Sequence, residues 1–147
     1  MSLKGKVAVV TGAARGLGRA IAIRLAADGA AVSAWDLNGA GAEETARMIR
    51  DAGGQAIGLE CNSAIADAIA AAVARTHAEL GKVAILVNNA ALSPFLKFED
   101  ITEEIWDTLM AVNMKGPFLC CKAMIPDMVE ANWGRIINIS SSSAQSG

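Results

Sequence analysis

Short apolar runs that alternate with helical patterns constrain the fold of this chain more than any other feature. Most of these runs are continuous rather than interrupted by polar residues, which is typical of strands buried on both faces of a parallel sheet. Strands that alternate with helices are joined by right-handed crossovers. We therefore predict an α/β fold, a doubly wound parallel sheet of the Rossmann type, with strands at residues 7–10, 31–35, 55–59, 83–87 and 135–139.

Four helices are predicted between these strands. Ser63 is a candidate N-cap for the third helix, and Glu43 and Arg47 form an exposed i, i+4 pair on the second. Pro117 and Pro126 should bend or break the fourth helix, because proline cannot donate the backbone hydrogen bond of a helix interior. The expected helices cover residues 17–29, 40–52, 63–81 and 102–131.

Composition excludes several classes of function. The chain has 147 residues, 53% of them hydrophobic, and a formal net charge of −2, which fits one globular domain and argues against binding nucleic acid through a positive field. It shows no signal-peptide pattern and no apolar run long enough to cross a membrane, so we expect a cytoplasmic protein. Cys61, Cys120 and Cys121 lack the spacing of a metal site or of a disulfide framework, and we expect reduced thiols and no metal.

A glycine-rich turn follows the first predicted strand and leads into the first helix. Its glycines are Gly12, Gly16 and Gly18, a spacing variant of the dinucleotide fingerprint with one extra residue early in the turn. Glycine adopts positive φ and has no Cβ to obstruct a ligand, while a helix N-terminus offers free N–H groups to anionic oxygens. Glycines also make ordinary turns, but this position between a strand and a helix indicates binding of a dinucleotide pyrophosphate.

An acidic residue ends the second predicted strand. The carboxylate of Asp36 could accept hydrogen bonds from the ribose hydroxyls of the adenosine half, and it would repel a 2′-phosphate. Arg15, within the glycine turn, is the counter-argument, since its guanidinium could neutralise such a phosphate. Because the repulsion from Asp36 is direct, we expect NAD to be preferred over NADP.

Four motifs in order give the chain a strong resemblance to the short-chain dehydrogenase/reductase family. They are Thr11-Gly12-x-x-x-Gly16-x-Gly18, Asn88-Asn89-Ala90-Ala91, Asn113 within residues 112–116, and the Ile139-Ser140-Ser141 that ends the fifth strand. The resemblance extends over essentially the whole chain. It implies that residues 1–147 are a dinucleotide-binding Rossmann domain, the N-terminal five-strand portion, incomplete at its C-terminal end.

The resemblance also implies a role for individual residues. Asn113 would interrupt its helix and hold a water in a proton relay, and Ser141 would hydrogen-bond the substrate oxygen, with Ser142 and Ser143 as alternatives. Residues 93–96 would form an apolar wall of the substrate pocket. The cofactor would be bound by Gly12, Arg15, Gly16, Leu17, Gly18, Asp36, Leu37, Asn62, Ser63, Asn89, Ala90 and Ala91.

Two of these positions depart from the family pattern. Asn62 stands where the family usually has an aspartate that meets the adenine amino group, and an amide oxygen can still accept from that amine. Ala91 stands in place of a usual glycine, a change of one methyl group. We expect cofactor binding to survive both changes.

The family's acid/base pair is not found in this sequence. The family uses a tyrosine, with a lysine four positions later, but the chain contains no tyrosine. His77, late on the third helix, is expected to be a surface residue and no substitute. The resemblance implies an NAD-dependent oxidoreductase acting on a secondary alcohol or ketone, homo-oligomeric when complete. We expect this chain alone to be inactive.

Two alternatives stay open. The chain could be a non-catalytic module that binds a dinucleotide, or a fragment that folds only with its complementary C-terminal piece. The apolar face of residues 102–131 motivates the second alternative, because such a face should be buried against another element.

Overall fold

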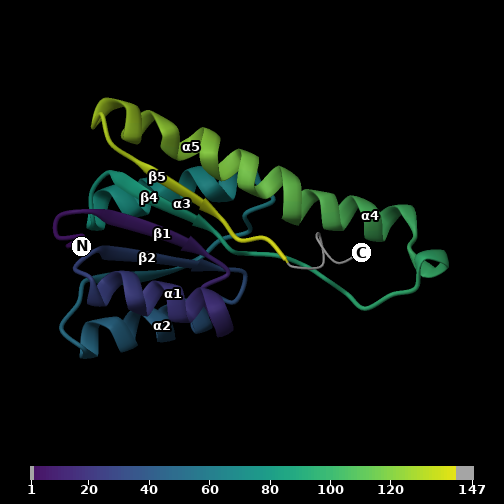
Figure 1. Ribbon diagram of the computed structural model, residues 1–147, viewed down its shortest axis with the longest axis horizontal. Coiled ribbons are helices and arrows are strands. Elements are labelled where there is room, and N and C mark those ends of the chain that lie inside the picture. Colours follow the sequence, from purple (N-terminus) through teal and green to yellow (C-terminus); the bar gives the residue numbers. More distant parts are fainter. Residues whose placement is uncertain (1, 142–147) are drawn as a thin grey trace.

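A five-stranded parallel sheet forms the centre of the molecule (Figure 1). The computed structural model describes residues 2–141. The strands follow the order β3-β2-β1-β4-β5, so the chain winds outward in both directions from β1, as predicted. Their bounds agree with the predicted runs to within one residue at each end. They are β1 (Val7–Thr11), β2 (Ala31–Asp36), β3 (Ala56–Glu60), β4 (Val83–Asn88) and β5 (Arg135–Asn138).

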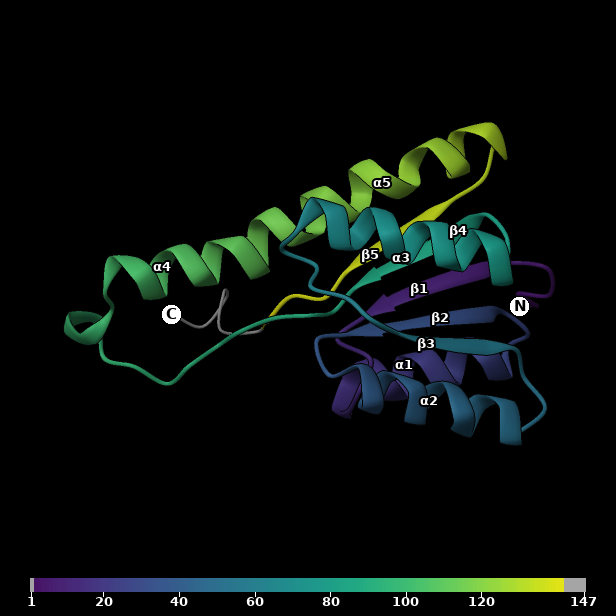
Figure 2. The same ribbon diagram turned by 180° about the vertical axis from the view of Figure 1, so that it is seen from behind.

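Helices cover both faces of the sheet (Figures 1 and 2). On one face, α1 (Gly16–Ala27) and α2 (Gly39–Asp51) pack on a core that includes Val10, Val32 and Ile49. On the other face, α3 (Ala66–Glu79) and α5 (Gly116–Glu130) pack on a second core that includes Val9 and Trp35. Every residue of β1 and β4 is buried, which explains their uninterrupted apolar sequences.

The predicted helix at residues 102–131 is irregular at Asn113 rather than at the prolines. It consists of α4 (Glu103–Met110), a π-helical segment η2 (Ala111–Lys115) and α5. Pro117 lies in the first turn of α5, directly after the π-helical segment, and α5 continues through Pro126. A break at Pro126 does not occur, so that part of the expectation is wrong, whereas the interruption at Asn113 is present as the π-helical segment.

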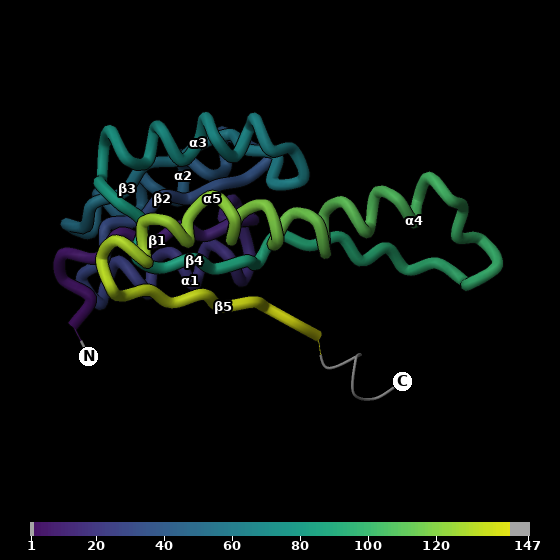
Figure 3. The backbone as a smooth tube through the Cα atoms, turned by 90° about the horizontal axis from the view of Figure 1, so that it is seen from above, coloured from purple at the N-terminus to yellow at the C-terminus, as the bar shows by residue number. Residues whose placement is uncertain are grey.

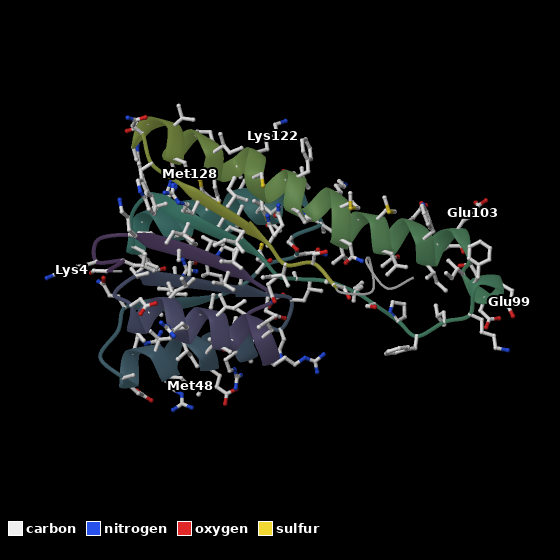
Figure 4. The ribbon with its side chains drawn as sticks, in the orientation of Figure 1. Lys4, Met48, Glu99, Glu103, Lys122 and Met128 are labelled. Carbon is white, nitrogen blue, oxygen red and sulfur yellow. The ribbon has the colours of Figure 1, made fainter. Side chains whose placement is uncertain are left out.

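The loop after β4, the 3-10 turn η1 (Phe98–Asp100) and α4 together form an arm that extends away from the sheet (Figure 3). Glu99 and Glu103 lie near its far end (Figure 4). No residue of α4 is buried, in contrast to the helices that pack on the sheet.

Two local predictions are wrong. Ser63 does not cap α3, because the helix begins three residues later and the turn before it is closed by Asn62, whose Oδ1 accepts from Ala64 N at 3.0 Å. Glu43 does not pair with Arg47. Its carboxylate instead bonds the guanidinium of Arg50 and accepts from Gly58 N, because β3 passes close beside α2 there.

His77 is not a simple surface residue, as the sequence had suggested. Its Nε2 lies 2.6 Å from Oδ2 of Asp127 on α5, and that same oxygen accepts from Val83 N at 2.9 Å. Asp127 is 7% exposed. The carboxylate therefore joins α3, the start of β4 and α5, and gives the imidazole a half-buried setting.

Burial on both faces, which was predicted for most of the strands, does not extend to β5. All four of its residues are exposed, although it pairs in parallel with β4 over its whole length. It combines Ile136 and Ile137 with the polar Arg135 and Asn138, and in the described part of the chain it is an edge strand. Burial of β5 thus depends on its position in the sheet, which local sequence does not encode.

Candidate functional site

A cavity of about 420 Å³ opens at the carboxyl ends of the strands, where β1 and β4 lie side by side and their following loops diverge. This is the switch point of a doubly wound sheet, the usual ligand site of such folds. The cavity brings together every residue predicted to bind the cofactor: Gly12, Arg15, Gly16, Leu17, Gly18, Asp36, Leu37, Asn62, Ser63, Asn89, Ala90 and Ala91.

The glycine turn has the geometry that a pyrophosphate requires. Gly12 and Gly16 have φ angles of 66° and 56°, and a Cβ on Gly18 would lie 2.1 Å from the Gly12 carbonyl oxygen. Beside Gly16 a Cβ would meet no atom within 4 Å, so the turn leaves open space. α1 begins here without a side-chain cap and without an acidic residue in its first turn. Its N-terminal N–H groups are therefore oriented for an anion, and a dinucleotide pyrophosphate fits this turn.

Thr11 and Asn89 fasten the two sides of the cavity to each other. The Thr11 hydroxyl accepts from the backbone N–H groups of Asn89 and Ala90, each at 3.0 Å. The Asn89 amide donates to the carbonyl oxygens of Thr11 and Gly12 at 3.0 and 3.1 Å. These bonds hold the loop after β4 against the phosphate turn.

Asp36 supports the turn as well as lining the cavity. Its Oδ2 accepts from Ala14 N at 3.0 Å, and its Oδ1 accepts from Asn38 N at 2.9 Å. Each carboxylate oxygen can accept a second hydrogen bond, so two ribose hydroxyls could still be bound. Asn62 lines the same cavity from the end of β3.

Asn113 is placed by hydrogen bonds rather than by contact with the cavity. Its Nδ2 donates to Leu92 O at 2.8 Å and its Oδ1 accepts from Leu92 N at 2.9 Å. The side-chain amide therefore anchors the loop that follows Ala91. Its partner Leu92 and its chain neighbour Val112 do line the cavity.

Ser141 lies beyond the end of β5, at the same carboxyl edge of the sheet as the cavity, and it is exposed. Asn138, the last residue of β5, accepts through Oδ1 from Asn88 Nδ2 at 2.8 Å, which fixes the strand end beside β4. Ser142 and Ser143 lie outside the described residues.

A second hollow of about 660 Å³ adjoins the first one. The two share Arg15, Ala91 and Leu92, and the second extends between the loop after β4 and α4. Of the residues 93–96 that were predicted to line a substrate pocket, Ser93, Pro94 and Leu96 line this hollow, whereas Phe95 does not and is fully exposed. Phe95 is therefore not part of the apolar wall that the sequence predicted.

Sequence reasoning missed several lining residues, namely Thr11, Trp35, Cys61, Leu92 and Val112. Thr11 and Cys61 directly adjoin predicted site residues at the ends of strands, so position relative to a strand end was a signal that could have found them. Cys61, Cys120 and Cys121 are free thiols, as expected. Burial raises the pKa of Cys61 to about 11 and that of Cys120 to about 12.

Residues 2–141 contain no group of three or more His, Cys, Asp or Glu side chains placed to hold a metal ion. Within the same residues, no helix combines the length and apolar character that crossing a membrane requires.

Comparison with known proteins gives consistent matches. The family model described as short chain dehydrogenase matches residues 6–147. D-threitol dehydrogenase of Mycolicibacterium smegmatis is 42% identical over 142 residues, covering 97% of this chain and 55% of that protein. The chain thus spans about half the length of this curated relative.

Two solved structures resemble the fold closely. A putative short-chain alcohol dehydrogenase from Sinorhizobium meliloti superposes with a TM-score of 0.93 at 36% identity, covering 99% of this chain and 58% of the other. A metagenomic short-chain oxidoreductase in complex with NADP superposes with a TM-score of 0.89 at 42% identity, covering 96% of this chain and 64% of the other.

Proposed function

The chain belongs to the short-chain dehydrogenase family, and from that premise we propose that its switch-point cavity binds NAD for hydride transfer to or from a secondary alcohol or ketone. The observation that carries the proposal is the uncapped start of α1 behind a turn of positive-φ glycines, within a cavity that Asp36 also lines. A bound nicotinamide dinucleotide would supply the hydride chemistry.

The preference for NAD over NADP rests on Asp36. Its carboxylate lies where an adenosine ribose would be held, and a 2′-phosphate there would meet a negative charge. Arg15 lines the same cavity and favours the opposite choice, and the metagenomic relative was solved with NADP. We propose that Asp36 prevails, because its two backbone hydrogen bonds fix its position, whereas Arg15 is exposed.

Substitution of Asp36 by alanine tests this choice. Asp36→Ala should lower the ratio of NAD affinity to NADP affinity by about tenfold, since about 1.4 kcal/mol of charge repulsion would be removed. The ratio can be measured by calorimetric titration of the chain with each dinucleotide. Asp28→Ala is the matched control, because Asp28 is an acidic residue at the opposite end of α1. An unchanged ratio in Asp36→Ala would refute the assignment.

On the substrate side, we propose that Ser141 donates a hydrogen bond to the carbonyl oxygen on which negative charge develops. The hollow beside Ser93, Pro94 and Leu96 would receive the apolar part of the substrate. Asn113 would act through the loop that it anchors at Leu92 and through a water held for a proton relay. In the family, a tyrosine and a lysine four positions later complete this chemistry. The chain has no tyrosine and therefore no such pair.

We therefore expect residues 1–147 alone to bind a dinucleotide without turning it over, because hydride transfer needs oriented reactants and proton delivery together. Oxidation of a secondary alcohol by this chain at ordinary enzymatic rates would overturn that expectation. The match to dehydrogenases favours an oxidoreductase as the parent protein. It does not favour the two alternatives, a non-catalytic module that binds a dinucleotide and a fragment that folds only with its complementary C-terminal piece. A cytoplasmic location stays a prediction.

We also propose a homo-oligomer formed through α4 and α5. Large apolar side chains are exposed along these helices at spacings of four and seven, which places them on one side: Trp106, Met110, Met114, Phe118, Ile125 and Val129. Sedimentation equilibrium measures the association, and a chain that stays monomeric at high concentration would refute this interface.

A further inference from the structure

The backbone of the phosphate turn is hydrogen-bonded by side chains of α1 and α2 that do not line the 420 Å³ cavity. Thr45 of α2 donates from its hydroxyl to Ala13 O at 2.8 Å, and Arg19 of α1 donates from its guanidinium to Ala14 O. On the other side, Ala13 N donates to Trp35 O and Ala14 N to Asp36 Oδ2, both at 3.0 Å. Both alanines thus have their N–H and carbonyl groups bonded within the protein.

Arg19 connects the three elements that meet at this turn. Its Nε donates to Thr45 Oγ1 at 3.0 Å, and its Nη2 pairs with Glu44 Oε2 at 2.7 Å as well as bonding Ala14 O. Its side chain is only 25% exposed. A planar guanidinium can serve several acceptors at once in a fixed geometry, which a lysine ammonium cannot reproduce.

The bond to Ala14 O has a direct consequence for the ligand side. The Ala14 carbonyl and the Arg15 N–H belong to one trans peptide, so the two groups point in opposite directions. Fixing the oxygen therefore fixes the direction of the Arg15 N–H, at the residue that precedes α1 and lines the cavity. The preceding peptide is fixed in the same way, because Thr45 bonds its oxygen, Ala13 O, and Asp36 bonds its N–H, Ala14 N.

We infer that Arg19 is a positioning residue for the pyrophosphate: its hydrogen bonds to Ala14 O and Thr45 Oγ1 preset the peptide planes of the phosphate turn. The inference rests on the proposed dinucleotide site and deepens it. Preorganised donors bind an anion more tightly because the cost of ordering them has already been met in the free protein. Glu44 and Thr45 extend the positioning to α2, so the stability of the turn depends on helix packing as well as on its glycines.

Arg19→Lys in the full chain tests the inference with two ligands, ADP and adenosine. The lysine keeps the positive charge and the apolar stem but cannot serve all three acceptors. ADP affinity should fall by about tenfold, the equivalent of one or two lost hydrogen bonds, while adenosine affinity stays unchanged because adenosine carries no phosphate. Arg24→Lys is the matched control, because Arg24 lies on the same helix, is 77% exposed and pairs only with Asp28 among the described ion pairs.

The ratio of the two affinities separates positioning from general support of the fold. A merely structural role would lower the unfolding free energy and weaken both ligands alike. Amide hydrogen exchange in the ligand-free chain gives an independent readout. Exchange at Ala14 N should accelerate in Arg19→Lys, whereas exchange at Val9 N in the core of β1 should not change.

The outcomes also separate this inference from the proposed function. Suppose that the unsubstituted chain binds ADP and that Arg19→Lys changes neither the ratio of ADP affinity to adenosine affinity nor the hydrogen-exchange rate at Ala14 N. The positioning role is then wrong, and the proposed site stands. If the parent chain binds ADP no better than adenosine, the pyrophosphate site itself is wrong, and the role of Arg19 fails with it.

Discussion

The two halves of this sheet, one on each side of its centre in the strand order, differ in how completely other elements cover them. On the side of β1, β2 and α2, the strands are buried except at the two ends of β2, and the backbone groups of Ala13 and Ala14 in the turn are hydrogen-bonded. On the side of β5 and α4, every strand residue is exposed and no helix residue is buried. The part of the cavity that we propose for adenosine and pyrophosphate is lined by residues at the ends of β1 and β2.

On the proposed function, this difference would place cofactor binding and chemistry in separate parts of the fold. The phosphate turn is built by residues close to one another along the first strand-helix units, and it is complete within these residues. The proposed reacting edge is formed by β5, Ser141 and the arm, and these elements are exposed in the described residues. A chain with only the first property can hold a dinucleotide without orienting a substrate against it.

The largest expected effect comes from disrupting the covered side at Gly12. At φ 66°, a Cβ on Gly12 would lie 2.9 Å from both Ala90 Cα and Asn89 Nδ2. Gly12→Val should therefore lower NAD affinity by at least about a hundredfold, because the two walls of the cavity would be forced apart. Fluorescence titration with NADH or calorimetry with NAD measures the loss.

Gly53→Val is the matched control for this change. Gly53 also has a positive φ, 86°, but a Cβ there would meet nothing within 4 Å, so the variant carries the backbone strain without the collision. Its cofactor affinity should equal that of the parent chain. Retained affinity in Gly12→Val would contradict the placement of the pyrophosphate.

A smaller effect, on stability, is expected at Asp127, which joins α5 to the start of β4 and to α3. Asp127→Ala would leave the buried Val83 N–H without its acceptor and His77 without its partner. The unfolding free energy should fall by about 2 to 3 kcal/mol, measured by urea denaturation. Glu130→Ala on the same helix should cost less than about 0.5 kcal/mol, because Glu130 and its partner Lys82 are exposed. Equal losses in both variants would mean that Asp127 is no anchor.

The smallest effect on stability should come from the uncovered side. Phe118 is 61% exposed, and Phe118→Gln should change the unfolding free energy by less than about 0.5 kcal/mol. It should still weaken self-association and lower the binding of a hydrophobic dye, since the apolar face is interrupted at its centre. Lys122→Gln, at an exposed charged position of α5, should leave both signals unchanged. A stability loss as large as that of Asp127→Ala would show that Phe118 is packed in solution.

The sequence predicted the sheet because its signals are local. Runs such as 7–10 and 83–87 are uninterrupted because both faces of those strands are covered, and the five predicted strands all form. The turn at Gly12, Gly16 and Gly18 was also readable, since its glycines are required by φ and by close approach. Errors arose where the outcome depends on a distant partner: Glu43 bonds Arg50 beside β3, and His77 meets Asp127 across two helices.

The sequence alone therefore determined the parallel α/β sheet, the glycine turn and the acidic end of β2, because periodicity, turn geometry and strand ends are properties of neighbouring residues. Only the tertiary structure decided the exposure of β5, the bonding of Asn113 to Leu92 and the grip of Arg19 on Ala14. Burial and long-range hydrogen bonds depend on which elements lie next to one another, and that is fixed when the whole chain packs.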